Sequence, residues 1–177
     1  TRDIDLADID GDGDVDLAFS EGGGRALEIF LGDGAERFGH ALTQNVTVEL
    51  LQSGDFDGDG FDDIVSVHES DSEYDSAVPD ASFDVGTDGH VRIAFGSADP
   101  DVWTNITLAE GADASAAEDA AIADLNQDGH LDVVVAAELA HLLYLQNPGP
   151  GARTEPWPRL ILPMTKGRGS YIRVFVA

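Results

Sequence analysis

The chain has 177 residues, no cysteine and a formal net charge of −26 at pH 7. Without cysteine it can form neither a disulfide framework nor a thiolate metal site. So acidic a chain is not expected to bind nucleic acid or an anionic membrane surface, and no apolar stretch approaches the length of a membrane span. Its length is enough for one domain with a hydrophobic core.

A nine-residue pattern, Asp-x-Asp/Asn-x-Asp-Gly-x-x-Asp, occurs three times along the chain. The copies are DIDGDGDVD (8–16, loop one), DFDGDGFDD (55–63, loop two) and DLNQDGHLD (124–132, loop three). Oxygen-bearing side chains at alternate positions, with a glycine for a sharp turn, are what a hard cation such as Ca²⁺ requires. Three copies in the same sequence context therefore indicate a repeated metal-binding unit.

Four short apolar runs accompany each loop: one before it, two after it, and one that begins near an aromatic residue. The runs before the loops are 3–8, 50–55 and 120–124, and the runs directly after them are 17–20, 64–67 and 133–136. The third runs are 26–34, 90–99 and 141–149, and the fourth runs begin near Phe38, Trp103 and Trp157. Their β-branched and aromatic residues, bounded by Gly, Asp, Asn and Pro, predict strands. Only 114–123, which is rich in alanine, also fits a helix or a loop that leads into a strand.

Four antiparallel strands per repeat are typical of β-propeller blades. We therefore expect an all-β fold of three four-stranded blade-equivalents in one domain, 1–177, with repeats at 1–47, 48–116 and 117–177. The second repeat contains an acidic insertion, 69–89, which is either a solvated loop or a lid, a partner contact or an additional calcium site. The last run, 170–177, matches the runs that precede the loops. We accordingly expect a larger propeller, in which further blades or neighbouring subunits cover the open sheet edges.

The three loops and their flanking strands resemble the FG-GAP/VCBS-type repeats of integrin α-subunit propellers and of many bacterial surface proteins. The phrase LYLQNPGPGARTEPWPRLI (143–161) is also similar to the ending of VCBS-type repeats. The resemblance covers nearly the whole chain. It implies a calcium-stabilised propeller, commonly of seven blades, with each Ca²⁺ in the hairpin loop between the first two strands of a blade. It implies no single activity, because such propellers serve adhesion, glycan processing and scaffolding.

Within each loop we expect side-chain ligands from positions one, three, five and nine and a backbone carbonyl ligand from position seven. The expected side-chain ligands are Asp8, Asp10, Asp12 and Asp16 in loop one, Asp55, Asp57, Asp59 and Asp63 in loop two, and Asp124, Asn126, Asp128 and Asp132 in loop three. The expected carbonyl ligands are those of Asp14, Phe61 and His130. An EF-hand is excluded, because its loop needs a glutamate at position twelve, where this chain has Phe19, Ser66 and Val135. We expect one Ca²⁺ per loop, bound more weakly in loop three, where Asn126 replaces a carboxylate.

The sequence favours a calcium-stabilised extracellular or cell-surface β-propeller that acts as a binding, adhesion or structural module, with protein or carbohydrate partners. Two alternatives stay open: the propeller of a polysaccharide-active enzyme of the lyase or dehydratase type, and a structural subunit of an extracellular filament. No catalytic residue is predicted, because the five histidines are scattered and no GxSxG motif is present. Two glycosylation sequons begin at Asn45 and Asn105, and both lie in predicted outer-strand regions of their repeats.

Overall fold

The structure is a computed structural model, and it describes residues 3–20, 27–35, 37–44, 50–68, 89–114, 117–137, 141–163, 165 and 174–175. Within these ranges the chain contains twelve β-strands, two short 3₁₀ segments and no α-helix. The 3₁₀ segments are η1 (Gly111–Asp113) and η2 (Gly149–Gly151). The all-β class predicted from the sequence is therefore confirmed.

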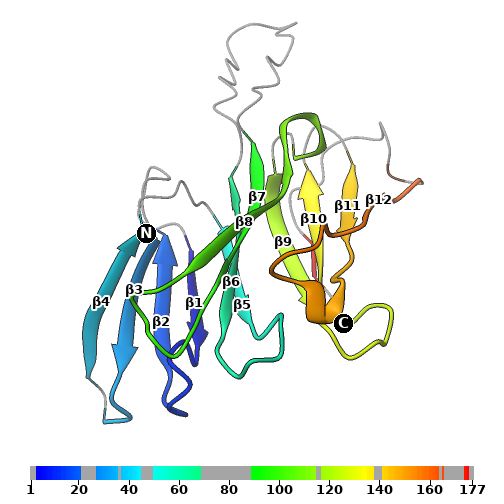
Figure 1. Cartoon of the computed structure of the whole chain (residues 1–177). Helices are drawn as coiled ribbons and strands as arrows, with labels where there is room; N and C mark the ends of the chain where they lie inside the picture. The colour runs from blue at the N-terminus through cyan, green and yellow to red at the C-terminus, as the bar shows by residue number, and fades with distance from the viewer. Residues whose placement is uncertain are drawn as a thin grey trace, which may run out of the picture.

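The strands form three separate four-stranded antiparallel sheets, which stand side by side in Figure 1. Blade one contains β1 (Ile4–Ala7), β2 (Asp16–Ser20), β3 (Leu27–Gly32) and β4 (Phe38–Gln44). Blade two contains β5 (Leu50–Gly54), β6 (Asp63–His68), β7 (His90–Phe95) and β8 (Thr104–Glu110). Blade three contains β9 (Ala117–Ala123), β10 (Asp132–Ala137), β11 (Leu142–Leu145) and β12 (Arg159–Ile161). Strands that follow one another in the sequence are neighbours in each sheet, as expected of propeller blades.

The alanine-rich run 114–123 forms strand β9 rather than a helix. Its residues pair with β10 from Ala123 and Asp132 at one end to Ala117 and Ala137 at the other. Ala117 and Ala120 are buried in the core, and β9 lies against β5 and β6 of blade two. Small side chains let these strands approach closely, so packing between blades outweighs the high helix propensity of alanine.

Several features predicted from the sequence lie outside the described residues. These are residues 69–88 of the insertion, the sequon at Asn45 and most of the run 170–177. The second sequon residue, Asn105, is exposed on β8. Val174 is described, and its backbone N–H donates to Asp119 Oδ2 on β9 at 2.8 Å. The equivalent hydrogen bond between blades one and two runs from the N–H of Leu51 on β5 to Asp3 Oδ2, next to β1, at 3.0 Å.

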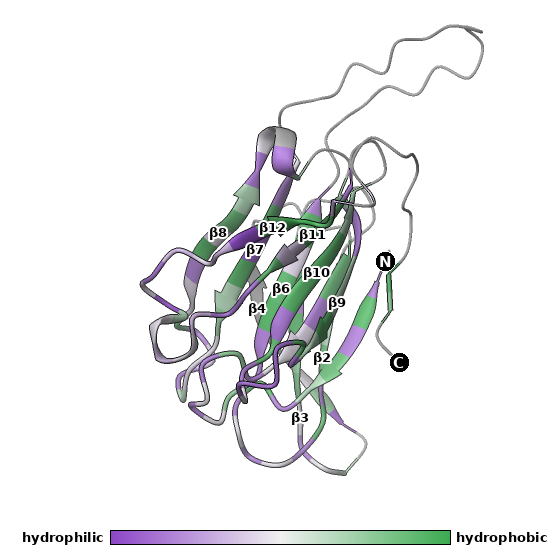
Figure 2. Cartoon of the chain, turned by 90° about the vertical axis from the view of Figure 1, so that its right-hand side faces the viewer, coloured by the Kyte–Doolittle hydropathy of each residue, from purple (hydrophilic) through white to green (hydrophobic). Residues whose placement is uncertain are grey.

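The hydrophobic core lies between the blades, and strand β6 shows why. Ile64 belongs to the cluster shared with blade one, whereas Val65 and Val67 belong to the cluster shared with blade three. Because successive side chains of a strand point to opposite faces, one strand in the middle sheet contributes to both clusters. Figure 2 accordingly shows β6 and β10 as largely hydrophobic strands, with hydrophilic residues in the loops below them.

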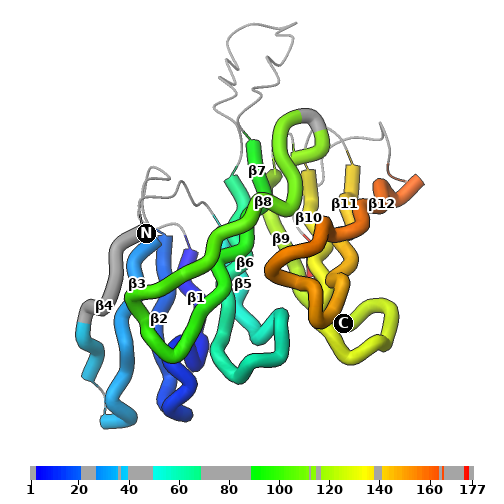
Figure 3. Tube along the Cα trace, viewed as in Figure 1, coloured from blue at the N-terminus to red at the C-terminus, as the bar shows by residue number. Residues whose placement is uncertain are grey.

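The first strands of successive blades are neighbours, since β1 contacts β5 and β5 contacts β9. Loops one, two and three each connect the first two strands of their blade, so they all lie at the same end of the three sheets (Figures 1 and 3). The fold thus places the three acidic loops side by side, with the second loop between the other two.

Candidate metal centres

The ninth residue of each loop is a fully buried aspartate that ties the loop to its own blade. In loop one, Asp16 Oδ2 accepts the N–H of Ile9 at 2.7 Å, and Asp16 Oδ1 accepts the N–H of Gly32 at 2.7 Å. Asp63 and Asp132 make the equivalent pairs of bonds, with N–H donors from Phe56 and Gly96 and from Leu125 and Asn147. Each of these carboxylates therefore joins the start of its loop to the turn that ends the third strand.

The first and sixth residues of each loop are joined by a hydrogen bond. In loop one the N–H of Gly13 donates to Asp8 Oδ2 at 3.1 Å. Gly60 and Gly129 donate in the same way to Asp55 and Asp124, at 3.0 and 2.9 Å. The three glycines have φ angles of 89°, 92° and 93°, a region that favours glycine. The sequence-based reason for a glycine at this position is thus confirmed.

The fifth residue of each loop bends the chain back on itself. Asp12 Oδ1 accepts the N–H of Asp14 at 2.8 Å, and Asp59 and Asp128 accept the N–H groups of Phe61 and His130 at 3.1 and 3.0 Å. Aspartates favour such turns because a carboxylate can accept the N–H two residues further along. The three residues expected to be carbonyl ligands are therefore held by their N–H groups against position five.

Positions one, three and nine come together in the first two loops. Carboxylate oxygens of Asp8, Asp10 and Asp16 lie within 4.8 Å of one another, and those of Asp55, Asp57 and Asp63 do the same. The predicted ligands at position five, Asp12 and Asp59, are not members of these two groups. Among the residues that the structure describes, loop three forms no such group of three acidic side chains, because Asn126 occupies position three.

Residues 8–66, which include loops one and two, match the family model of the FG-GAP-like repeat. The chain contains an FG-GAP-like repeat. No curated protein and no solved structure matches the chain. Within the described residues, no helix is long and apolar enough to cross a membrane.

Loop one of this FG-GAP-like repeat contains an unsatisfied carboxylate oxygen. Asp8 Oδ1 is buried and has no hydrogen-bond partner among the described residues. The pKa of the neighbouring Asp10 is raised above its usual value. Burial is the largest cause and the charges of Asp16, Asp12 and Asp8 add to it, whereas the hydrogen bond from the N–H of Asp12 lowers the pKa in part. Both observations fit a site that a cation completes, because a buried carboxylate oxygen is costly without a partner.

Loop two differs because a side chain from blade three reaches into it. Arg153 follows η2, and its Nε donates to Asp57 Oδ2 while its Nη2 donates to Asp59 Oδ2 at 2.6 Å. Burial lowers the pKa of Arg153, but its hydrogen bond to Asp57 and the nearby carboxylates raise it above the usual value. Burial raises the pKa of Asp63 to about 7, although the N–H groups of Phe56 and Gly96 lower it.

Loop three receives side-chain hydrogen bonds from its own blade. Asn126 Nδ2 donates to Asp128 Oδ2 at 2.8 Å, and the Tyr144 hydroxyl donates to Asp132 Oδ2 at 2.9 Å. Burial, this hydrogen bond and the loop carboxylates raise the pKa of Tyr144 to about 12. Sequence reasoning identified neither Tyr144 nor Arg153. The only available signal for Arg153 was an arginine beside the NPG turn of a chain that has nine basic residues in all.

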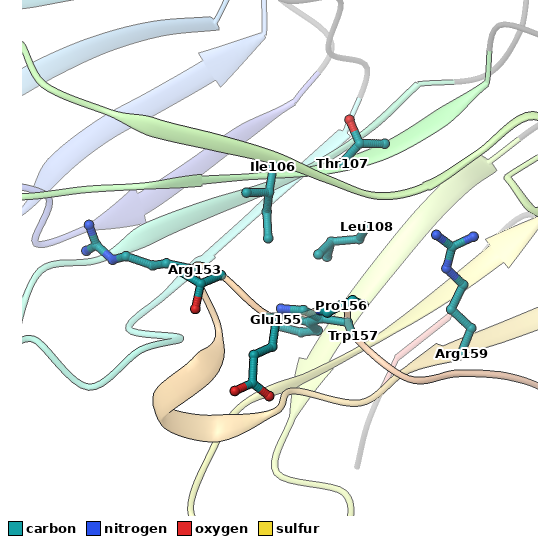
Figure 4. A pocket seen from close by; sticks show the side chains of 9 residues that line it. Ile106, Thr107, Leu108, Arg153, Glu155, Pro156, Trp157 and Arg159 are labelled. Atoms are coloured by element: carbon teal, nitrogen blue, oxygen red, sulfur yellow. The ribbon is translucent and has the colours of Figure 1, made fainter.

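A groove of about 310 Å³ lies between β8 and the segment that follows η2. Ile106 and Leu108 line it from blade two, and Trp157 and Arg159 line it from blade three. Figure 4 shows Arg153 at its edge, extending away from Trp157 and from Arg159. Arg159 instead pairs with Asp113 at 3.2 Å, where both side chains are exposed. The two arginines of this segment thus have different surroundings.

Proposed function

We propose that the chain is a calcium-binding β-propeller module of an extracellular or cell-surface protein. Ca²⁺ binds in the acidic loops and holds each hairpin rigid, and it performs no chemistry there. The module then presents a stable surface to protein or carbohydrate partners. The FG-GAP-like repeat at 8–66 and the three blade-like sheets support the propeller part of this proposal.

The arrangement of loop one carries the metal part of the proposal. Asp8, Asp10 and Asp16 converge within 4.8 Å, and Asp8 Oδ1 is buried without a hydrogen-bond partner among the described residues. Like charges at this distance repel one another, and a cation at their centre reverses the sign of that interaction. Asp8 and Asp10 would supply oxygens to the ion, and Asp16 would contribute while it keeps its two backbone donors.

Calcium is the cation that suits this donor set best. Ca²⁺ accepts six to eight oxygen ligands in flexible geometry, whereas Mg²⁺ demands strict octahedral geometry and keeps its waters. Multi-carboxylate loops of modest affinity fill where free Ca²⁺ is abundant, which is outside the cell. We therefore place the module outside the cell or on its surface.

Calorimetric titration tests the proposal. The chelator-treated chain is titrated with CaCl₂ and, separately, with MgCl₂, and thermal unfolding is followed in parallel. We expect calcium to bind more tightly and to raise the melting temperature, since a ligand at a hundred times its Kd stabilises the folded state by about 2.7 kcal/mol per site. No binding heat together with an unchanged melting temperature would contradict the proposal.

A pair of variants in loop one separates ligand loss from charge loss. Asp8→Asn removes a predicted ligand, whereas Asp14→Asn removes the same charge at a position where only the carbonyl is a predicted ligand. We expect Asp8→Asn to abolish one binding event and Asp14→Asn to preserve it. Equal effects of the two substitutions would show that calcium responds only to the net charge of the loop.

A further inference from the structure

Arg153 lies where it can replace a metal ion in loop two. Its guanidinium group donates to the carboxylates of Asp57 and Asp59 and to the carbonyl of Gly96, the last at 2.9 Å. A metal ion in an acidic loop would likewise neutralise carboxylates and attract carbonyl oxygens. In the structure, a fixed charge from another blade already performs both tasks.

The surroundings of Arg153 hold it in this position. Its guanidinium carbon lies 5.1 Å from the centre of the Phe95 ring, a distance at which a cation and an aromatic face attract each other. On its own segment, the Trp157 indole N–H donates to the carbonyl of Ala152 at 3.0 Å, and both residues are buried. The backbone that carries Arg153 is therefore fixed on blade three, while its side chain extends to blade two.

Arg153 and a metal ion in loop two would require the same oxygen atoms. Asp57 belongs to the group of three carboxylates, with Asp55 and Asp63, whose oxygens lie within 4.8 Å of one another. The Nε of Arg153 donates to Asp57 Oδ2. A divalent ion bound by Asp57 would be repelled by a guanidinium group only a few ångströms away. Loop one has no such arginine among the described residues, and there Asp8 Oδ1 lacks a partner.

We propose that Arg153 is a built-in competitor for the divalent cation in loop two. This inference rests on the proposed calcium function, and it makes the first two loops unequal although they share the nine-residue pattern. Calcium binds to loop one directly, whereas it binds to loop two only when Arg153 leaves. Filling of loop two therefore releases a tie between blades two and three. It also changes the surroundings of Trp157, which lines the same groove as Arg153 and whose ring centre lies 6.0 Å from that of Phe56 in loop two. Arg153 acts as a specificity-determining residue, and it sets the calcium concentration at which loop two fills.

The test measures calcium affinities of the full chain by calorimetry, with Arg153→Gln as the variant and Arg159→Gln as its matched control. Both substitutions remove one positive charge from the same segment, but Arg159 contacts Asp113 outside the loops. We expect Arg153→Gln to tighten calcium binding at one site roughly ten- to hundredfold, the change in affinity that corresponds to the energy of a hydrogen bond to a charged group. We expect Arg159→Gln to leave every affinity unchanged. Addition of Asp57→Asn to Arg153→Gln should abolish the gain, which locates it in loop two.

An unchanged or weaker site in Arg153→Gln would overturn the inference, because Arg153 would then support the loop rather than compete. An equal gain in Arg159→Gln would also overturn it, since the effect would then be one of net charge. Absence of calcium binding at every site would instead refute the proposed function itself.

Tryptophan emission gives a second readout that keeps Arg153 in place. In a Trp103→Phe background, the emission of Trp157 should change at the calcium concentration that fills loop two, which is the binding event that Asp57→Asn removes. The same measurement with Asp57→Asn added should show no change. An emission that follows the binding event removed by Asp8→Asn, or that does not respond to calcium while loops one and two fill, would overturn the inference even if the Arg153 variants do not fold.

Discussion

Loops one and two have the same nine-residue pattern, and they share the hydrogen bonds made by positions five, six and nine. They differ at position one, because Asp55 Oδ1 accepts the N–H groups of Gly58 and Asp59 whereas the equivalent Asp8 Oδ1 accepts none within the described part of the chain. Their charges are also balanced differently. In loop one, Asp8 Oδ1 is buried without a partner among the described residues. In loop two, Arg153 of the next blade pairs with Asp57 and Asp59. The pattern thus determines the backbone of a loop, whereas the neighbouring blade determines how the loop is neutralised.

The contacts between blades explain this difference. Loop two lies under the turn that ends β11, where Asn147 Nδ2 donates to the Phe56 carbonyl at 2.7 Å. Loop one instead meets loop two directly, since the N–H of Asp8 donates to Asp62 Oδ2 at 2.9 Å and the N–H of Asp62 donates to the Asp8 carbonyl at 3.1 Å. The connection from the turn after β11 to Trp157 is longer than the connection from the turn after β7 to Trp103, and η2 lies in the longer one. That added segment carries Arg153 to loop two.

The largest effect should come from what the two loops share. Asp16→Ala and Asp63→Ala each remove a buried carboxylate and leave two backbone N–H groups without an acceptor. We expect each to lower the free energy of unfolding by about 4 kcal/mol, since every unsatisfied buried group costs about 1–3 kcal/mol. Urea unfolding in chelator and in calcium measures both losses. A loss below about 1 kcal/mol for either variant would break the comparison, because the shared scaffold would then not depend on this residue.

A smaller effect should separate the loops by their neighbours. Asn147→Ala removes the donor to the carbonyls of Phe56 and Leu131, so we expect a loss of about 2 kcal/mol. Asn105→Ala, on the exposed part of β8, is the control, and its expected effect is close to zero. If both variants unfold at the same urea concentration as the native chain, the turn of blade three does not hold loop two.

The sequence predicted the elements whose signals are local. The spacing of the loops, the runs around them and the glycine at position six each depend on nearby residues, and the sheets and positive φ angles confirm them. The position of Arg153 was not predictable, because it depends on how blade three packs on blade two. The double hydrogen bond of Asp16 was also missed, since a ligand and a buried clamp have the same side chain. The alternative helix prediction for 114–123 was wrong, because the packing of β9 against β5 and β6 outweighs the high helix propensity of alanine.

The pH dependence of loop two should be measurable without calcium. Burial raises the pKa of Asp63 to about 7, above its value of about 4 in the unfolded chain. The folded state therefore binds the proton more tightly than the unfolded chain does. Protonation of Asp63 thus increases the free energy of unfolding as the pH falls through 7. We expect about 1 kcal/mol more stability at pH 6 than at pH 8 from this group.

The slope of stability against pH in Asp63→Asn, compared with the native chain in chelator, isolates this contribution. Calcium at saturation should suppress it, because a bound cation favours the ionised carboxylate. The same slope in the variant and in the native chain would show that Asp63 does not titrate in this range.

The smallest effect concerns glycine at position four, where Gly11 and Gly58 have φ angles of 73° and 78°. A side chain at either position is strained by its backbone, but only at Gly11 would the added Cβ meet other groups, the Phe61 ring at 2.7 Å and the Gly60 carbonyl oxygen at 3.3 Å. Gln127 occupies this position in loop three at a φ of 61°, so the strain alone is tolerated. We therefore expect Gly11→Ala to be less stable than Gly58→Ala by only about 0.5 kcal/mol, since a ring edge can shift at small cost. Thermal unfolding of the two variants, with and without Phe61→Leu, measures the difference. A difference that survives in Phe61→Leu would mean that the Phe61 ring is not its cause.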